Sequence, residues 1–417
     1  MFNFKQWKKW LQQTPWSKRW FIWLLLLRPI LDNFYYLKKI SPALSPLYIV
    51  GIFSPIVVLA VTSRLPKNPK SSLETMFNIL SVMVLASCFF IFLQDPSSKD
   101  TVSFVLKLPV MVYLFYFLRR VVNSRNDMEM IMQTFVYSAI FVAALLAYEV
   151  LINPVEVKYS RGLERIQGNF ADVTNYGFYA NLSFLCITYF FASKAATVPL
   201  LKRMLWLGAS IVFTVTVLLK INHTASWGVF LTLTGLFAYQ NIKVNKAGGF
   251  IAVAVIVVMV GVLFSDTLIE TIRPLIATDL AVADGDQDSS RLLHGRVGRW
   301  DRLLDDFFNT PFYAQLFGMP LSFEDVRLYC GTGSHNDFLR HFFFTGIVGF
   351  IVYTLFTIQV ALSAFATKQP LKQYLVLGGV IFTVLYSVST NPSIYPPVMY
   401  LIVPIYCYAC LPASRSN

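Results

Sequence analysis

The sequence has few charged residues for its length. Only 14% of its 417 residues are Asp, Glu, Lys or Arg, whereas 56% are hydrophobic. A soluble chain is usually about one quarter charged and about 45–50% apolar. Because a membrane-spanning helix needs roughly 20 apolar residues, this composition excludes a soluble multidomain enzyme and a disordered chain. It predicts an all-α, polytopic membrane protein.

Cysteine and the motifs of soluble enzymes are also scarce. The chain has five cysteines, four of them inside apolar runs, so no disulfide framework can be drawn. The spacing of Cys407-x-x-Cys410 resembles a redox pair, but its place in the last apolar run favours simple packing. The sequence contains no Gly-rich phosphate loop ending in Lys-Ser/Thr, no His-Glu-x-x-His and no Gly-x-Ser-x-Gly. The familiar hydrolase and nucleotide-binding classes therefore have no support.

Apolar runs between charged or Pro/Gly-rich breaks predict twelve membrane spans. They cover residues 21–35, 47–62, 76–93, 101–118, 130–152, 173–192, 200–219, 224–239, 248–264, 338–365, 371–388 and 393–411. This divides the chain into a basic, Trp-rich interfacial segment (1–20), nine spans (21–264), a loop domain (265–333), three spans (334–411) and a short tail (412–417). The first segment is expected to lie as an amphipathic helix on the membrane surface.

The net charge of +13 could suggest a nucleic-acid partner. In a membrane protein, however, Lys and Arg in alternate loops set the orientation. They are denser in the loops around residues 64–70, 119–125 and 194–203 than in the intervening loops. The chain is therefore expected to cross the membrane many times with both termini in the cytoplasm, and to bind no nucleic acid.

Two external segments are long enough to carry function. One covers residues 153–172 and the other residues 265–333, and loops beyond about 12–15 residues are usually functional or disordered. In the second, Trp300, Leu303, Leu304, Phe307 and Phe308 follow helical spacing, which predicts an amphipathic helix packed on the mouth of the bundle. The sequence Asp284-x-Asp286-x-Asp288 could hold a divalent cation, but it lacks the Glu of an EF-hand loop. It is interpreted as an acidic turn.

Charged residues at membrane depth are costly and mark candidate sites. Arg28 and Asp32 stand four residues apart, so they can form a structural ion pair or serve a function. Lys107 can reach toward the membrane surface or contact a ligand. Lys220 and His223 lie in a tight turn that is predicted to be external.

The densest polar cluster at any predicted helix entrance begins at residue 334. It contains Ser334, His335, Asn336, Asp337, Arg340 and His341. The external loops add cations, namely Arg161, Arg165, Arg291, His294, Arg296, Arg299 and Arg302. Because the planar guanidinium group offers paired donors to phosphate oxygens, these residues suggest an anionic headgroup bound at the outer membrane surface. The alternative is a solvated basic loop.

Three stretches of the chain resemble the bacterial O-antigen polymerase and ligase superfamily. The stretch His335-Asn336, nine residues, Gly346, two residues and Gly349 resembles the family's His-Asn…Gly-x-x-Gly signature. The other two are Gly295-Arg296-x-x-x-Trp300 with Pro311 and Gly318, and Arg165-x-x-Gly168-Asn169-Phe170…Asn175. One departure occurs, because Trp227 stands where the family often has Arg in Thr-x-Ser-Arg-Gly. Lys220 or His223 could supply the missing charge.

The resemblance implies a metal-independent membrane glycosyltransferase of GT-C-like fold, without a cofactor, facing the periplasm from the bacterial inner membrane. Its donor would be a glycan on undecaprenyl diphosphate, and a chain-length regulator is a possible partner besides the membrane lipids. His335 would orient or deprotonate the acceptor hydroxyl. The donor diphosphate would be held by Arg161, Arg165, Lys220, Arg291 and Arg296. The acceptor would be contacted directly or indirectly by Asn336, Asp337 and Arg340, while Gly346 and Gly349 would allow close helix packing.

Within this family the sequence around His335 is more similar to polymerases, which join lipid-linked repeat units, than to ligases, which transfer the glycan to lipid A-core. Another polysaccharide transferase of the superfamily is a further alternative. A transporter of the same lipid-linked sugar belongs to a different class and would need charged residues along a path through the bilayer. Here the ionisable residues gather at the expected external mouth, which favours chemistry at the surface.

Overall fold

The computed structural model describes residues 2–35, 37, 40, 46–94, 96, 99–152, 157–160, 163–168, 170, 172–244, 273, 276–318 and 334–412. The chain is mostly helical. Its first half contains α1 (Phe4–Gln13), α2 (Trp16–Asn33), α4 (Pro46–Thr62), α5 (Ser72–Gln94), α6 (Lys99–Lys107), α7 (Val110–Val121), α8 (Arg125–Leu151), β1 (Val157–Ser160) and β2 (Leu163–Ile166). There follow α9 (Thr174–Ser193), α10 (Leu200–Ile221), α11 (Thr224–Val244), η2 (Ser289–Arg291), α13 (Leu292–Phe308), α14 (Phe312–Phe317), α16 (Asp337–Ala366), α17 (Pro370–Ser387), η4 (Pro392–Ile394) and α18 (Pro396–Ala409).

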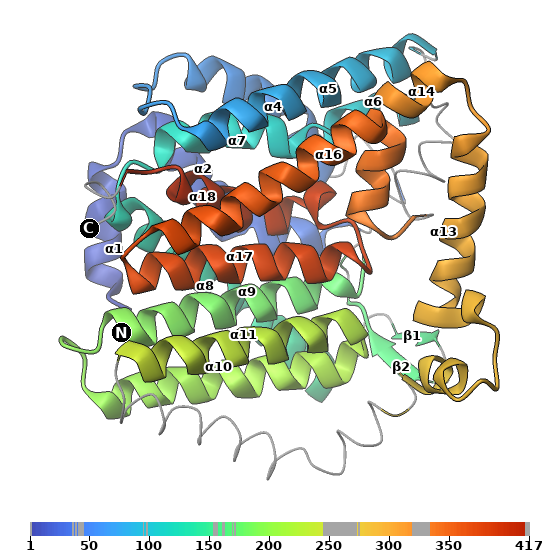
Figure 1. Cartoon of the computed structure of the whole chain (residues 1–417). Helices are drawn as coiled ribbons and strands as arrows, with labels where there is room; N and C mark the ends of the chain where they lie inside the picture. The colour runs from blue at the N-terminus through green and yellow to red at the C-terminus, as the bar shows by residue number, and fades with distance from the viewer. Residues whose placement is uncertain are drawn as a thin grey trace.

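The long helices form a bundle with two distinct ends (Figure 1). At one end α13 runs across the ends of the long helices, with α14 and the β1–β2 hairpin near its two extremities (Figure 1). We call this the α13 end. Both chain termini lie at the opposite end, which we call the terminal end (Figure 1).

Helix α9 forms the centre of the bundle. It packs against α8, α10, α11, α17 and α18. Every residue from Thr174 to Phe191 is buried, so this helix is surrounded by protein on all sides, as expected of a helix that is hydrophobic all round. The residues that it carries at its start are consequently held in a rigid frame.

Helical segments occupy each predicted span that lies in the described part of the chain, although the span 101–118 is divided between two helices. Within the described residues, four helices are long and apolar enough to cross a membrane, namely α5, α8, α10 and α16, and shorter apolar helices cover residues Ile49–Thr62 and Pro396–Ala409. A mostly helical chain with candidate membrane-spanning helices is therefore confirmed, which agrees with a membrane-embedded protein, whereas the number of twelve crossings stays a prediction. The predicted span 248–264 lies outside the described residues.

One predicted span is wrong as drawn. Residues 101–118 were expected to form a single helix, but α6 ends at Lys107 and α7 begins at Val110. Pro109 precedes α7, and its carbonyl accepts the hydrogen bond from the Val112 nitrogen at 2.9 Å. Because proline has no N–H and its ring clashes with the preceding helical turn, the apolar run breaks here.

The basic N-terminal segment forms a helix, α1, as expected. Its Trp7 side chain is buried, and the indole Nε1 donates to Thr134 Oγ1 of α8 at 2.8 Å. One face of α1 is therefore packed on the bundle. Its lysines at positions 5, 8 and 9 remain exposed.

A small antiparallel hairpin departs from the all-α expectation. Strands β1 and β2 pair Val157 with Ile166 and Lys158 with Arg165. The hairpin lies at the α13 end (Figure 1), and the Asn222 side-chain amide donates to the carbonyl of Glu164 at 2.9 Å. This bond fastens β2 to the turn between α10 and α11.

Candidate functional site

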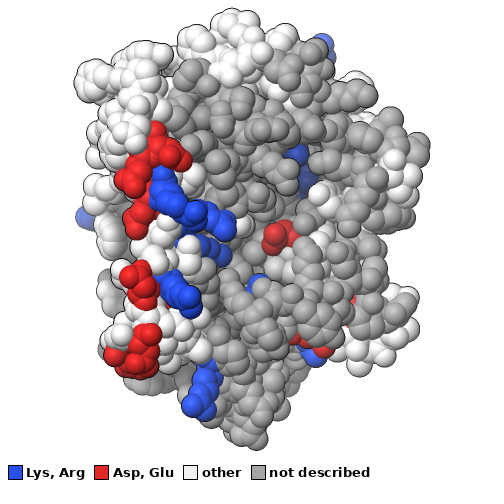
Figure 2. All heavy atoms as spheres, turned by 90° about the vertical axis from the view of Figure 1, so that its right-hand side faces the viewer, with Lys and Arg blue, Asp and Glu red and all other residues white. Residues whose placement is uncertain are grey.

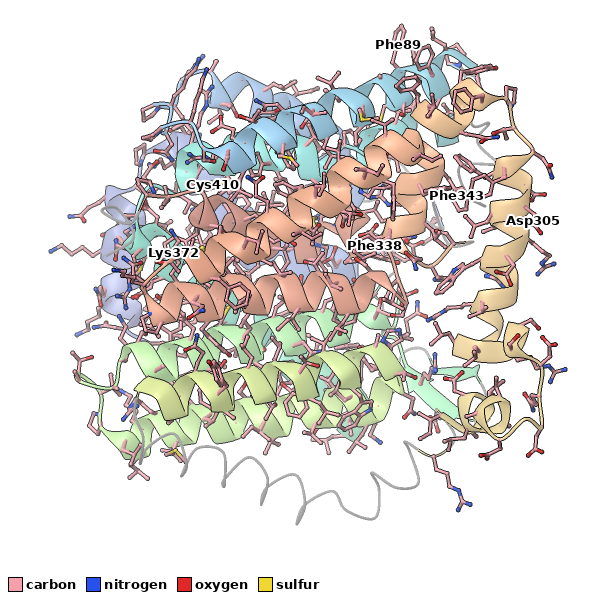
Figure 3. All side chains as sticks on the ribbon, viewed as in Figure 1. Phe89, Asp305, Phe338, Phe343, Lys372 and Cys410 are labelled. Atoms are coloured by element: carbon pink, nitrogen blue, oxygen red, sulfur yellow. The ribbon has the colours of Figure 1, made fainter. Side chains whose placement is uncertain are left out.

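The first feature of the α13 end is the attachment of α13 to the start of α16. The indole Nε1 of Trp300 donates to the carbonyl of Ser334 at 2.7 Å. Further along, Phe307 is fully buried against Phe342 and Phe343, with ring centroids 4.6 and 5.7 Å away. Figure 3 shows Phe343 turned toward α13 and Asp305 on the opposite, outward side of that helix. The predicted amphipathic helix is confirmed, and its apolar stripe faces the bundle except at Phe308, which was expected to pack inward but is 54% exposed.

A second attachment joins α14 to a break in α16. Gly346 has φ +70 and ψ −175, which interrupts the helix. A Cβ on Gly346 would lie 2.3 Å from the Leu316 carbonyl oxygen, and one on Gly318 would lie 2.3 Å from the Phe344 carbonyl oxygen. Both glycines are therefore needed for this contact between backbones, because each has a positive φ (+70 at Gly346 and +100 at Gly318) and neither position has space for a Cβ. The expectation that Gly346 allows close packing is confirmed.

His335 stands between two fixed neighbours. Ser334 is held by Trp300, and the Asn336 side chain accepts hydrogen bonds from the Phe338 and Leu339 nitrogens at 2.9 and 3.0 Å, capping α16. His335 itself has φ +44, in the left-handed region that non-glycine residues seldom adopt. Such a conformation persists only where the surroundings enforce it, which is typical of functional sites. The backbone thus sets the direction of the imidazole, which is half-buried.

Three charged groups influence the pKa of the His335 ring. Burial lowers the pKa of His335, the guanidinium groups of Arg296 and Arg299 lower it further, and the carboxylate of Asp172 acts in the opposite direction. The cations destabilise imidazolium by repulsion, and Asp172 partly offsets this. Burial and the two nearby positive charges therefore favour a neutral imidazole. A neutral imidazole can accept a proton, and the cations can stabilise an anion next to it.

The other members of the predicted cluster point into the protein. Asp337 and Arg340 form a buried ion pair, with Nε to Oδ1 at 2.8 Å. The Ser393 nitrogen donates to Asp337 Oδ2 at 2.8 Å and its hydroxyl to Oδ1 at 2.7 Å. Arg340 Nη2 also contacts the Ser393 hydroxyl and lies 2.9 Å from His341 Nε2. This network joins α16 to η4, and a contact of Asn336, Asp337 or Arg340 with an acceptor stays a prediction.

Arg165 lies on β2, in the segment that leads to α9. Three residues later Gly168 has φ +59, and a Cβ there would lie 2.2 Å from Oε1 of the buried Glu149. Tyr176 of α9 donates to the other oxygen of Glu149 at 2.7 Å. Glu149 at the end of α8 and Tyr176 near the start of α9 thus form a hydrogen-bonded pair, and the segment that carries Arg165 packs against Glu149. Only glycine fits at position 168, because of the positive φ and the close approach of Glu149.

The turn between α10 and α11 holds a second polar group. Lys220 is exposed, and His223 is buried with Nδ1 2.9 Å from Ser226 Oγ. Tyr386 donates to Ser226 Oγ at 2.8 Å and receives a hydrogen bond from the Asn181 amide at 2.9 Å. His223 is therefore tied into a network between α9, α11 and α17. Trp227 is buried beside it, so the position expected to carry Arg faces the protein interior.

The remaining predicted donor residues lie apart or outside the described residues. Arg291 is exposed in η2, where it helps to lower the pKa of Asp288, after the stronger effect of the hydrogen bonds from Ser290. Arg161 lies outside the described residues. Among the described residues, no group of three or more His, Cys, Asp or Glu is arranged to hold a metal ion, the acidic turn 284–288 included. A metal-independent reaction stays a prediction.

Two residues of this region were missed by sequence reasoning. Asp172 caps α9, accepting from the Thr174 nitrogen and hydroxyl at 2.9 Å each, and also faces His335. Its signal was available, because an Asp two residues before a helix is a typical cap. Ser393 gave no signal, since its role depends on η4 folding back onto the start of α16.

The face that bears this site is strongly charged. Figure 2 looks onto the α13 end, where basic side chains lie beside a row of acidic ones. The exposed residues of α13 and the preceding turn include Asp284, Asp286, Asp288, Arg291, Arg299, Asp301, Arg302, Asp305 and Asp306. Charged side chains therefore gather along α13 at this end of the bundle (Figure 2).

The comparisons with known proteins leave the family open. No protein-family model matches the chain, and no curated protein sequence matches it.

Proposed function

We propose that this chain is a membrane glycosyltransferase that joins lipid-linked oligosaccharide repeat units, as an O-antigen polymerase does. The observation that carries the proposal is the strained backbone of His335 next to the Trp300–Ser334 hydrogen bond, with Arg296 and Arg299 near enough to lower the pKa of the imidazole. These residues come from two of the three stretches that resemble the family, and the Trp300–Ser334 hydrogen bond joins those stretches.

The proposed donor is a glycan on undecaprenyl diphosphate. When the acceptor hydroxyl attacks C1 of the sugar, the bond to the diphosphate breaks and negative charge builds up on the leaving group. Fixed guanidinium groups in a partly dry site stabilise that charge without reorganising. Arg296 is proposed for this role. Arg165, Arg161, Arg291 and Lys220 are proposed to guide or hold the rest of the donor.

His335 is the proposed general base. Its neutral imidazole would accept the proton of the acceptor hydroxyl as the new glycosidic bond forms. The lowered pKa favours the neutral form at physiological pH. Asp172 would then stabilise the imidazolium that results, because a carboxylate next to a cation offsets the repulsion from the arginines.

We further propose the setting of this reaction: about twelve spans in a GT-C-like arrangement, in a bacterial inner membrane. Both termini would be cytoplasmic and the α13 end would face the periplasm. The loops predicted to be cytoplasmic are the ones rich in Lys and Arg, which supports this orientation. A chain-length regulator is the proposed protein partner.

The decisive experiment uses purified protein in lipid nanodiscs with undecaprenyl-diphosphate repeat units alone. A polymerase lengthens the glycan, and the ladder of products is read by gel or mass spectrometry. A ligase leaves the glycan unextended until lipid A-core is added. A transporter moves labelled donor across vesicles without forming a bond, and that result would refute the proposal.

A further inference from the structure

The end of α13 and the short helix α14 carry large aromatic side chains that the protein does not cover. Phe312, Tyr313 and Phe317 are 72%, 64% and 61% exposed, and Phe308 is 54% exposed. No charged residue occurs between Asp306 and Glu324. Exposed aromatic rings in an uncharged segment of this kind are unfavourable in water. Something apolar must cover this edge.

The same edge adjoins an exposed apolar surface of α5, which is a candidate membrane span. Helix α5 can cross a membrane by length and composition, and it exposes Ile79, Val82, Leu85, Phe89 and Leu93 on one face. Both α5 and α14 pack against α16 at one place. The α14 backbone contacts Gly346. Three residues further on, a Cβ added to Gly349 would lie 3.3 Å from the Cε atom of Met83 in α5. Phe89 stands at the α13 end of α5 (Figure 3). The aromatic edge therefore continues the exposed apolar surface of α5 toward the polar face.

The charged residues of α13 end where the exposed aromatic residues begin. Asp301 and Asp305 are exposed, and Asp305 points away from the bundle (Figure 3). The uncharged aromatic segment begins immediately after Asp306. A helix with charged residues facing water and aromatic residues at its end fits the boundary between headgroups and acyl chains, where aromatic side chains are enriched.

We propose that α14 and the end of α13, with Phe308, Phe312, Tyr313 and Phe317 as contacts, are embedded in the lipid interface of the membrane at the α13 end. The partner is the lipid surface itself, not a protein. Because α14 is locked to Gly346 and α13 to Ser334, this anchor sets the depth at which Arg296 and His335 stand relative to the lipid headgroups. The anchoring does not depend on the proposed glycosyl transfer.

The test is spin-label accessibility in nanodiscs of phosphatidylethanolamine and phosphatidylglycerol. In a variant whose five cysteines are replaced, single cysteines are introduced as Phe312→Cys and Phe317→Cys, with Asp301→Cys and Asp305→Cys as matched water-exposed controls. Collision rates with oxygen, which concentrates in lipid, and with a nickel chelate, which stays in water, are measured for each label. Positions 301, 305, 312 and 317 are exposed, so the introduced cysteines leave the packing intact, and the unlabelled cysteine-free variant is compared with the wild-type chain by its thermal unfolding midpoint.

The expected result is an oxygen-to-nickel ratio at positions 312 and 317 several-fold higher than at 301 and 305. Equal ratios would place α14 in water and overturn the proposal. Low accessibility to both reagents at 312 and 317 would mean that protein covers the edge, such as a second copy of the chain, and would also overturn it. A variant with Phe312→Asp and Phe317→Asp, labelled at Tyr313→Cys, should lose the high ratio, since charged side chains pull the segment out of lipid.

Discussion

The two ends of the bundle use their cations in different ways. At the terminal end, buried or half-buried cations close helix ends: Lys372 donates to the Leu411 carbonyl at 2.7 Å and Arg203 to the Phe191 carbonyl at 2.8 Å. Lys372 and Cys410 lie there together (Figure 3). At the α13 end, Arg296 and Arg299 instead lie near enough to a histidine to lower its pKa.

The carboxylates follow the same division. Glu129 at the terminal end binds both Arg125 and Lys194 at 2.8 Å. It balances two positive charges and ties α8 to α9. Asp172 at the α13 end partly offsets the effect of two cations on the pKa of one imidazole. Its side chain also caps α9. A cation that donates to a helix carbonyl therefore indicates a structural role. Cations near a titratable ring whose backbone is strained indicate a functional site.

The largest expected effect comes from His335→Ala. If His335 is the general base, the rate of glycan extension should fall by about 10²- to 10⁴-fold, while the protein still folds because the ring is only half-buried. The measurement is the initial rate of extension in nanodiscs, with the thermal unfolding midpoint measured in parallel. His223→Ala, in the network of Ser226 and Tyr386, is the comparison variant. Wild-type rates for His335→Ala would exclude the catalytic role.

Arg296→Lys tests the arginine side of the comparison. Lysine keeps the charge but loses the planar pair of donors. Loss of one charge-assisted hydrogen bond costs about 1.5–3 kcal/mol, so kcat/KM for the donor should fall roughly ten- to a hundredfold. Arg64→Lys, an exposed arginine in a loop on the predicted cytoplasmic side, is the matched control and should change nothing. Unchanged donor use by Arg296→Lys would contradict the diphosphate assignment.

Glu129→Gln tests the terminal end. Removing the carboxylate leaves Arg125 and Lys194 facing each other without a counter-charge. Both cations are about one third exposed, so water screens part of the cost, and about 1–2 kcal/mol of stability should be lost. The unfolding midpoint should fall by several degrees, with the extension rate per folded molecule unchanged. Asp305→Asn, an exposed carboxylate, is the control. A large loss of rate at an unchanged midpoint would break the comparison.

Much of the fold was predictable, because apolar runs in lipid must form helices whatever their sequence. Pro109 was the exception, since a proline inside an apolar run is invisible to a hydropathy pattern. The hairpin 157–166 was missed because its charged residues hide the alternation of short strands. In the site, the spacing of Trp300 and Phe307 correctly predicted which face of α13 packs inward. The bond from Trp300 to Ser334 was not predictable, because it depends on where two distant segments meet.

The smallest expected effect is a shift in the pH profile. A neutral His335 is the active form, so kcat/KM should fall as the pH drops through the pKa of His335. Since burial, Arg296 and Arg299 lower that pKa, the acid limb should lie below the ordinary histidine value of about 6.5.

Asp172 raises the pKa, so Asp172→Asn should move the limb to still lower pH, while the amide oxygen keeps the cap of α9. Arg299→Gln should move it to higher pH, and Arg64→Gln should leave it in place. The profile is measured from about pH 5 to pH 9, with each shift a fraction of a unit up to about one unit. A limb that moves upward in Asp172→Asn would mean that a different group titrates, because no removal of a neighbouring carboxylate can raise the pKa of an imidazole.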